Sequence, residues 1–195
     1  MKSHYLGLAL LISTVTLYSC SSNDSTNKAE ELNNERIEKQ AIAMGADAKE
    51  DAKRVAKYMV QLSADQTTSL ELCRIAVQKA TNPEVRSLAQ QTLLAHQQDD
   101  RQLRVLAKQI NVTLPVEQSG DGKKLIDKLT DQERGTSFDI DYLDYMAALT
   151  DKLVDTSDDL ADDAPTDAVK EFAQEAKRDN KKIRDQAKQS KNALD

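Results

Sequence analysis

"SLELCRIAVQKATNPEVRSLAQQTLLAHQQDDRQLRVLAKQI", residues 69–110, contains two apolar stripes separated by a turn. On each side of the turn, apolar residues recur at spacings of three and four, which is the period of one face of an α-helix. Asn82 suits the N-cap of a new helix, Pro83 suits its first position and Glu84 suits its first turn. The stretch therefore predicts two long helices that fold back on each other at residues 81–84.

The same period predicts four helices in all. The first stripe starts near Val55, and two later segments, 138–160 and 169–194, repeat the pattern on either side of Pro165. A longer link with a short helix-prone piece at about 122–130 precedes them. The sequence thus predicts an all-α fold, with an antiparallel four-helix bundle over residues 51–195. The longer link leaves open a crossover between the second and third helices.

The composition agrees with a helical protein that has an acidic surface. Of the 195 residues, 31% are charged, 4% are aromatic and none is Trp, and the formal net charge is -6. Five Gly and three Pro are few for this length, which favours helices over sheets. Because phosphate binding needs clustered Lys and Arg, we expect no nucleic acid partner. Two cysteines cannot form a disulfide framework.

The N-terminal apolar run ends at Cys20. Residues 1–19 are short for a membrane span and have the size and apolar centre of a signal peptide. The run ends in LYSC at residues 17–20, which resembles the bacterial lipobox, although Tyr18 departs from its usual small residue. The resemblance implies a lipoprotein signal peptide over 1–19 and attachment to a membrane through lipid on Cys20. An ordinary cleaved signal or an uncleaved anchor is the alternative.

Residues 20–50 are expected to join this anchor to the bundle. The polar segment SSNDSTNKAEELNN, which follows Cys20, predicts a flexible tether. Residues 30–50 are helix-prone but weakly amphipathic, which predicts a peripheral helix or a frayed extension. By resemblance to other lipoproteins, Ser21 directly after the cysteine implies the outer membrane of a Gram-negative bacterium. The protein would face the periplasm or the cell surface.

Two short motifs within residues 50–190 match a known family. They are Asn-Pro-Glu-Val at 82–85 and Phe-Asp-x-x-Tyr at 138–142. With them the chain resembles the ferritin-like, four-helix domain of unknown function found in bacterial envelope proteins. The resemblance implies a ferritin-like bundle in the cell envelope or periplasm. We interpret the signature residues as structural: Asn82, Pro83, Phe138, Asp139 and Tyr142.

The chain departs from the family pattern where a cofactor would bind. Leu94 and Ala95 stand where the family often has two Asp before its histidine, and Thr150 stands where the third helix often has His. A di-iron centre needs Glu-x-x-His on two helices, but Leu93 lies three residues before His96. We therefore expect no cofactor and no enzymatic activity.

His96 is the strongest remaining candidate for a metal ligand. It lies on the core-facing stripe of its helix with Asp99 one turn later, and Glu71 lies on the preceding helix. These three residues define a weak site for a divalent ion, or a redox site. The alternative is a hydrogen-bonded polar layer that fixes the register of the helices, formed with Gln66, Ser69 and Thr150.

Two further features have structural explanations beside functional ones. Cys73 lies on a core stripe without a disulfide partner, so we expect a small buried hydrophobe rather than a nucleophile paired with His96. An acidic series between Asp151 and Asp167 lacks the spacing of a calcium loop. It predicts a solvated helix surface, with loose binding of cations or of a basic partner as the alternative.

These observations lead to two functional hypotheses. The first is a non-enzymatic, lipid-anchored envelope protein that acts as a binding or scaffold module under envelope stress, with a protein partner or a second copy of itself. The second is a weak divalent-metal-binding or redox protein centred on His96.

Overall fold

The computed structural model describes residues 24–40 and 45–194, and these residues form helices without any strand. The predicted signal peptide and Cys20 lie outside the described residues. The helices are α1 (Ser25–Gln40), α2 (Ala46–Lys79), α3 (Pro83–Gln109), α4 (Gly120–Asp131), α5 (Thr136–Asp162) and α6 (Asp167–Asn192). The prediction of an all-helical fold is confirmed. Within the described part of the chain, no helix is both long and apolar enough to cross a membrane.

The start of α3 follows the chemistry that the sequence predicts. The side chain of Asn82 accepts hydrogen bonds from the backbone N–H groups of Glu84 and Val85, and Pro83 opens α3. Ser119 and Thr166 cap α4 and α6 in the same way. Each such cap pairs a backbone donor that would otherwise lack a partner and contributes about 1 kcal/mol.

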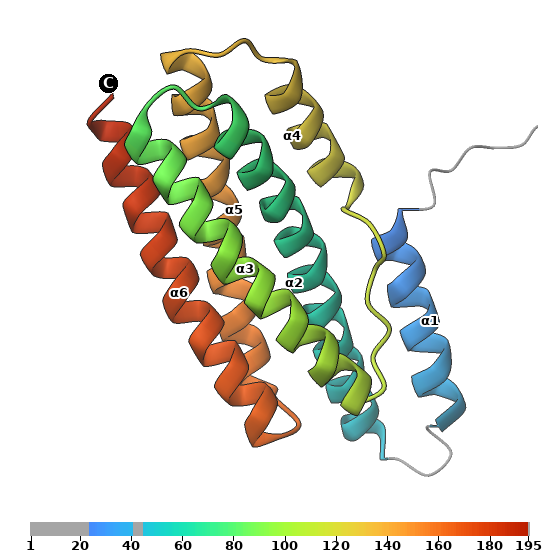
Figure 1. The fold of residues 1–195 in the computed structure, drawn as a ribbon. Helices are drawn as coiled ribbons and strands as arrows, with labels where there is room; N and C mark the ends of the chain where they lie inside the picture. The colour runs from blue at the N-terminus through green and yellow to red at the C-terminus, as the bar shows by residue number, and fades with distance from the viewer. Residues whose placement is uncertain (1–23, 41–44, 195) are drawn as a thin grey trace, which may run out of the picture.

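The four long helices α2, α3, α5 and α6 lie side by side, and a long connection joins α3 to α5 (Figure 1). This connection returns along the molecule and carries α4, which packs against α2 and α5. As a result α5 starts at the end where α2 turns into α3, and α3 and α5 run in the same direction. The helix predicted at about 122–130 is α4. The crossover that the sequence left open is present.

The core has two apolar halves. One lies near the α2–α3 turn and includes Leu72, Phe138 and Tyr142. The other lies toward the opposite end and includes Met59, Leu103, Leu153 and Phe172. Each fully buried large side chain contributes about 1.5–3 kcal/mol to folding. Buried polar residues, His96 among them, also lie on the inward faces of the helices.

Helix α1 packs on the outside of α2 and touches the α3–α4 connection (Figure 1). It starts at Ser25, so the flexible tether predicted after Cys20 does not extend through residues 25–34. Its buried face is small, with Ala29, Asn33 and Ile37. Asn33 donates to the carbonyl of Thr113 and accepts from its N–H, at 2.8 Å each. These paired bonds hold a weakly amphipathic helix against the rest of the protein.

Candidate functional site

His96 lies at the centre of a buried polar layer that joins three helices. Ser69 of α2 lies 2.7 Å from its Nδ1, and Asn180 Oδ1 of α6 lies 3.1 Å from its Nε2. The Asn180 amide nitrogen donates to the Ala176 carbonyl, so its oxygen must be the group that faces His96. His96 therefore donates from Nε2 and accepts the Ser69 hydroxyl proton at Nδ1. Both ring nitrogens are occupied.

The imidazole is neutral in this layer. Complete burial lowers the pKa of His96 from 6.5 to about 4, and the hydrogen bond to Asn180 offsets only part of that shift. A neutral ring with both nitrogens engaged offers no lone pair to a metal ion and takes up no proton near neutral pH. This arrangement fits the predicted polar layer that sets helix register.

The other residues predicted for this layer have separate roles. The Thr150 hydroxyl donates to its own helix, to the carbonyls of Met146 at 2.6 Å and Ala147 at 3.2 Å. Gln66 is buried, and its side-chain oxygen has no hydrogen-bond partner among the described residues. Asn180 was not predicted. Its position on the apolar stripe of α6, in step with Ala176 and Ile183, was a usable signal.

The structure does not bring Asp99 and Glu71 together with His96 as ligands. Glu71 forms an ion pair with Arg74 at 2.7 Å on the surface of α2. Burial raises the pKa of Asp99 to about 6, and repulsion from the carboxylates of Asp179 and Glu175 raises it as well. Within the described residues, no three His, Cys, Asp or Glu side chains form a group that could hold a metal ion.

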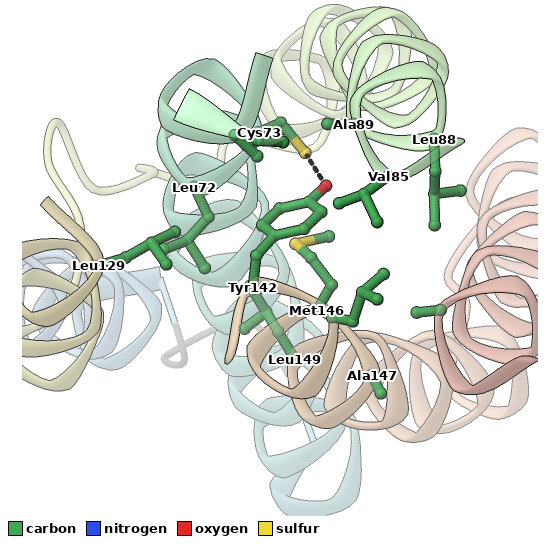
Figure 2. Close-up of a cluster of buried hydrophobic side chains, with 14 of the residues drawn as sticks. Leu72, Cys73, Val85, Leu88, Ala89, Leu129, Tyr142, Met146, Ala147 and Leu149 are labelled. Atoms are coloured by element: carbon green, nitrogen blue, oxygen red, sulfur yellow. Dashed lines mark hydrogen bonds between the residues drawn. The ribbon is translucent and has the colours of Figure 1, made fainter. Parts of the chain in front are cut away.

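Cys73 lies beside Tyr142 in the half of the core near the α2–α3 turn, and its Sγ is 3.4 Å from the phenolic oxygen (Figure 2). Burial raises the pKa of the Cys73 thiol to about 11 and that of Tyr142 well above its ordinary value. The thiol is therefore protonated at neutral pH and a poor nucleophile. Because His96 is engaged with Ser69 and Asn180, it is not positioned as a base for Cys73.

Asp139 connects the two signature motifs, at 82–85 and 138–142, through hydrogen bonds. Its carboxylate accepts hydrogen bonds from the N–H and hydroxyl of Thr81 and from the N–H of Asn82. It thereby ties the start of α5 to the α2–α3 turn. Phe138 and Tyr142 fill the core directly beside it.

Lys79 was missed by the sequence analysis. Its ammonium donates to the carbonyl of Thr130 in the last turn of α4 at 2.7 Å and to that of Gln132, directly after the helix, at 2.6 Å. It also lies 5.6 Å from the centre of the Phe138 ring. It therefore fixes the end of α4 against α2 and α5. No periodic or motif signal connects Lys79 to residues so distant in the chain.

Part of the acidic series on α5 is paired. Asp151 forms ion pairs with Arg184 and Lys188, and Asp158 forms one with Lys177. Asp163 is paired with Arg54 of α2. These pairs join α5 to α6 and α2, so these three residues of the series have a structural role.

A sequence model described as domain of unknown function DUF4142 matches residues 38–190. The chain belongs to the DUF4142 family. The match includes α2 to α6 except the last residues of α6, whereas most of α1 precedes it. No curated protein matches this DUF4142 chain.

Solved structures with a similar fold come from distant proteins. A DUF305 fragment from Deinococcus radiodurans has a TM-score of 0.63 and 13% identity, and the match covers 72% of this chain and 96% of that one. The conserved hypothetical protein rv2844 from Mycobacterium tuberculosis has a TM-score of 0.60 and 15% identity, with 73% and 94% covered. At such identities the likeness concerns the fold alone.

Proposed function

We propose that this DUF4142 protein is a lipid-anchored envelope protein whose helical domain acts as a non-enzymatic binding or scaffold module. The observation that carries the anchor is the LYSC sequence at residues 17–20, placed at the end of an apolar run of signal-peptide size. The outer membrane of a Gram-negative cell is the proposed location. The helical domain is proposed to have the ferritin-like four-helix topology, which the crossover between α3 and α5 supports.

The chemistry of the core supports a role without catalysis. His96 is neutral and doubly hydrogen-bonded, and the Cys73 thiol is protonated. On the outside, α3 exposes Leu94 by 63% and Val105 by 57%. These two residues lie about three turns apart on one face of the helix, where a protein partner or a second copy would find apolar contact.

Lipidation provides the direct test of the anchor. The full chain is expressed in a Gram-negative host with an alkyne-labelled fatty acid, and labelled protein is detected after gel separation. We expect the wild type to incorporate label and fractionate with membranes, and Cys20→Ser to lose the label. Cys73→Ala is the matched control, because it removes the other thiol and leaves the lipobox intact. Label that persists in Cys20→Ser would refute the anchor.

The scaffold role is tested by association of the purified protein. Sedimentation velocity of wild type and of Leu94→Gln/Val105→Gln measures whether this face of α3 carries self-association. We expect any concentration-dependent dimer of the wild type to be weakened in the double variant. A dimer that is unchanged in the variant places the contact elsewhere.

A further inference from the structure

A cavity of about 450 Å³ lies at the end of the molecule opposite the α2–α3 turn. Four parts of the chain form it: the end of α1, the start of α2, residues 110–112 after α3, and residues 163–165 between α5 and α6. This volume is within the range of small-molecule sites, about 300–1,000 Å³. The cavity is remote from His96 and uses none of the residues of the polar layer.

The inner wall of the cavity is apolar. Ile37 and Val55 are almost completely buried. Ile110, Val112 and Ala164 are partly buried and pack on the half of the core that lies opposite the α2–α3 turn. Ala52 on α2 provides a small side chain that leaves room in front of this wall. The wall is therefore suited to a hydrocarbon chain rather than to a polar ligand.

Arg36 supplies a positive charge at the same cavity. Its guanidinium donates to the hydroxyl of Thr113 at 3.3 Å and to the side-chain oxygen of Asn33 at 2.7 Å, both neutral acceptors. Among the described residues it forms no ion pair. A guanidinium carries five N–H donors, so these two bonds, one from Nη1 and one from Nη2, leave three N–H donors for a carboxylate.

The two acidic groups of the cavity share one cation, Arg54. Asp163 accepts two hydrogen bonds from Arg54, at 2.7 and 3.3 Å, and Asp51 accepts one at 2.7 Å. One guanidinium thus holds both carboxylates at one side of the cavity. Arg36 lies on the α1 side and is the cationic residue among the described residues that line the cavity.

We propose that this cavity binds an alkyl carboxylate, with its hydrocarbon chain on the wall of Ile37, Val55 and Val112 and its carboxylate paired with Arg36. The proposal is independent of the lipid anchor and goes beyond the scaffold role. Arg36 and Ile37 precede the DUF4142 match, which starts at residue 38. The site therefore depends on α1 docking against the family domain.

The probe is dodecanoate, titrated into the full chain below its critical micelle concentration and followed by calorimetry. We expect saturable binding of one molecule per chain and a higher melting temperature. Octanoate should bind more weakly, because each buried methylene contributes about fourfold in affinity. Dodecanol, which has the same chain without the charge, should also bind more weakly than dodecanoate. Absence of saturable dodecanoate binding would overturn the proposal.

Two variants assign the binding to this cavity. Arg36→Gln keeps a donor for Asn33. It should lower the affinity for dodecanoate by about tenfold or more and leave the affinity for dodecanol nearly unchanged. Lys39→Gln, on the same helix but outside the cavity lining, is the matched control and should bind dodecanoate like the wild type. Ala52→Leu fills the space in front of the apolar wall and should lower the affinity for both dodecanoate and dodecanol.

Unchanged dodecanoate affinity in both Arg36→Gln and Ala52→Leu would refute the site. So would equal losses for dodecanoate and dodecanol in Arg36→Gln, because these would indicate a change in structure rather than a lost charge pair. If Arg36→Gln does not fold, Ala52→Leu and the ratio of dodecanoate to dodecanol affinity in the wild type still decide the question.

Discussion

The carboxylate of Asp139 accepts hydrogen bonds from the hydroxyl of Thr81 at 2.6 Å and from its N–H at 3.0 Å, across 58 residues of sequence. One side chain at the start of α5 thereby determines how the turn between α2 and α3 is held. The carboxylate itself is buried, and a buried charged acceptor depends on such hydrogen bonds, so its bonds to the turn are important for stability.

Replacement of Asp139 by Ala should destabilise the protein. The change leaves the N–H groups of Thr81 and Asn82 unpaired, and we expect a loss of about 3 kcal/mol in the free energy of unfolding. Urea denaturation followed by circular dichroism measures it. Asp155→Ala, at an exposed position of the same helix, is the control and should change stability by less than about 0.5 kcal/mol. A similar small effect in both variants would contradict the role assigned to Asp139.

Gly122 in α4 is required by its contact with Thr68 of α2. A Cβ at residue 122 would overlap the Thr68 hydroxyl, which itself donates to the Ala64 carbonyl at 2.9 Å. Gly122→Ala should therefore destabilise the protein by about 1–3 kcal/mol, because α4 must move away from α2.

A double-mutant cycle tests this contact. Thr68→Ala removes the obstructing hydroxyl, so Gly122→Ala should cost much less in that background, with a coupling energy of about 1 kcal/mol or more. Thermal or urea unfolding of the four proteins measures the coupling. Additive effects would show that the helices do not meet at these two residues.

The local part of the fold could be predicted from the sequence, and the long-range part could not. Asn82 and Pro83 define the start of α3 through bonds within three residues, and the apolar stripes follow from the helical period. The partners of Asp139 and Lys79 lie more than fifty residues away, so no local rule identifies them. The predicted tether failed at α1 because hydrogen bonds from Asn33 to the α3–α4 connection, rather than a strong apolar face, hold that helix.

In the candidate site, too, local features could be predicted from the sequence and contacts between helices could not. His96 was placed correctly on an inward face together with Ser69, since both follow from periodicity. Asn180 was missed although it lies on the stripe of α6. Pairing across helices depends on relative heights along their axes, which the sequence does not specify. The proposed ligands Asp99 and Glu71 failed for other reasons: Asp99 lies near the carboxylates of Asp179 and Glu175, and Glu71 lies on the surface of α2.

His96 should make stability fall as the pH falls. Its folded pKa of about 4 is below the unfolded value of 6.5, so the unfolded chain binds a proton that the folded protein rejects. The contribution is fully present above pH 6.5 and is lost between pH 6.5 and 4, by about 2 kcal/mol at pH 5. The measurement is the stability difference between wild type and His96→Gln at pH 7 and pH 5. A difference that does not shrink at pH 5 would contradict a neutral buried imidazole.

Asp99 should have the opposite pH dependence. Its pKa of about 6 is above the unfolded value of 3.8, so its favourable contribution is present below pH 3.8 and lost as the pH rises through 6. At pH 7 the buried charge is unfavourable, and Asp99→Asn should stabilise the protein by about 1 kcal/mol after allowance for partial exposure to solvent. The gain should disappear at pH 4. Asp155→Asn, at an exposed position of α5, serves as the control and should change stability little at either pH.

Metal content is expected to be independent of His96. Protein purified without a histidine tag and dialysed against iron, manganese, zinc and calcium should retain well below one ion per chain, because both nitrogens of the ring are hydrogen-bonded. Elemental analysis of wild type and His96→Ala provides the comparison. One ion per chain that is lost in His96→Ala would revive the metal-binding hypothesis.

Release of α1 should follow the loss of Asn33. In Asn33→Ala the N–H and carbonyl of Thr113 lose both bonds to α1, and Arg36 loses one of its two acceptors. Because the apolar face of α1 is small, we expect hydrogen exchange in residues 25–40 to accelerate by about tenfold or more while exchange in α3 and α6 stays unchanged. Asn34→Ala, the exposed neighbour, is the control and should leave exchange as in the wild type. Equal exchange in all three proteins would show that α1 is held by its apolar contacts alone. Asn33→Ala should also lower the affinity for dodecanoate, because the cavity loses the apolar wall and the cation that α1 supplies.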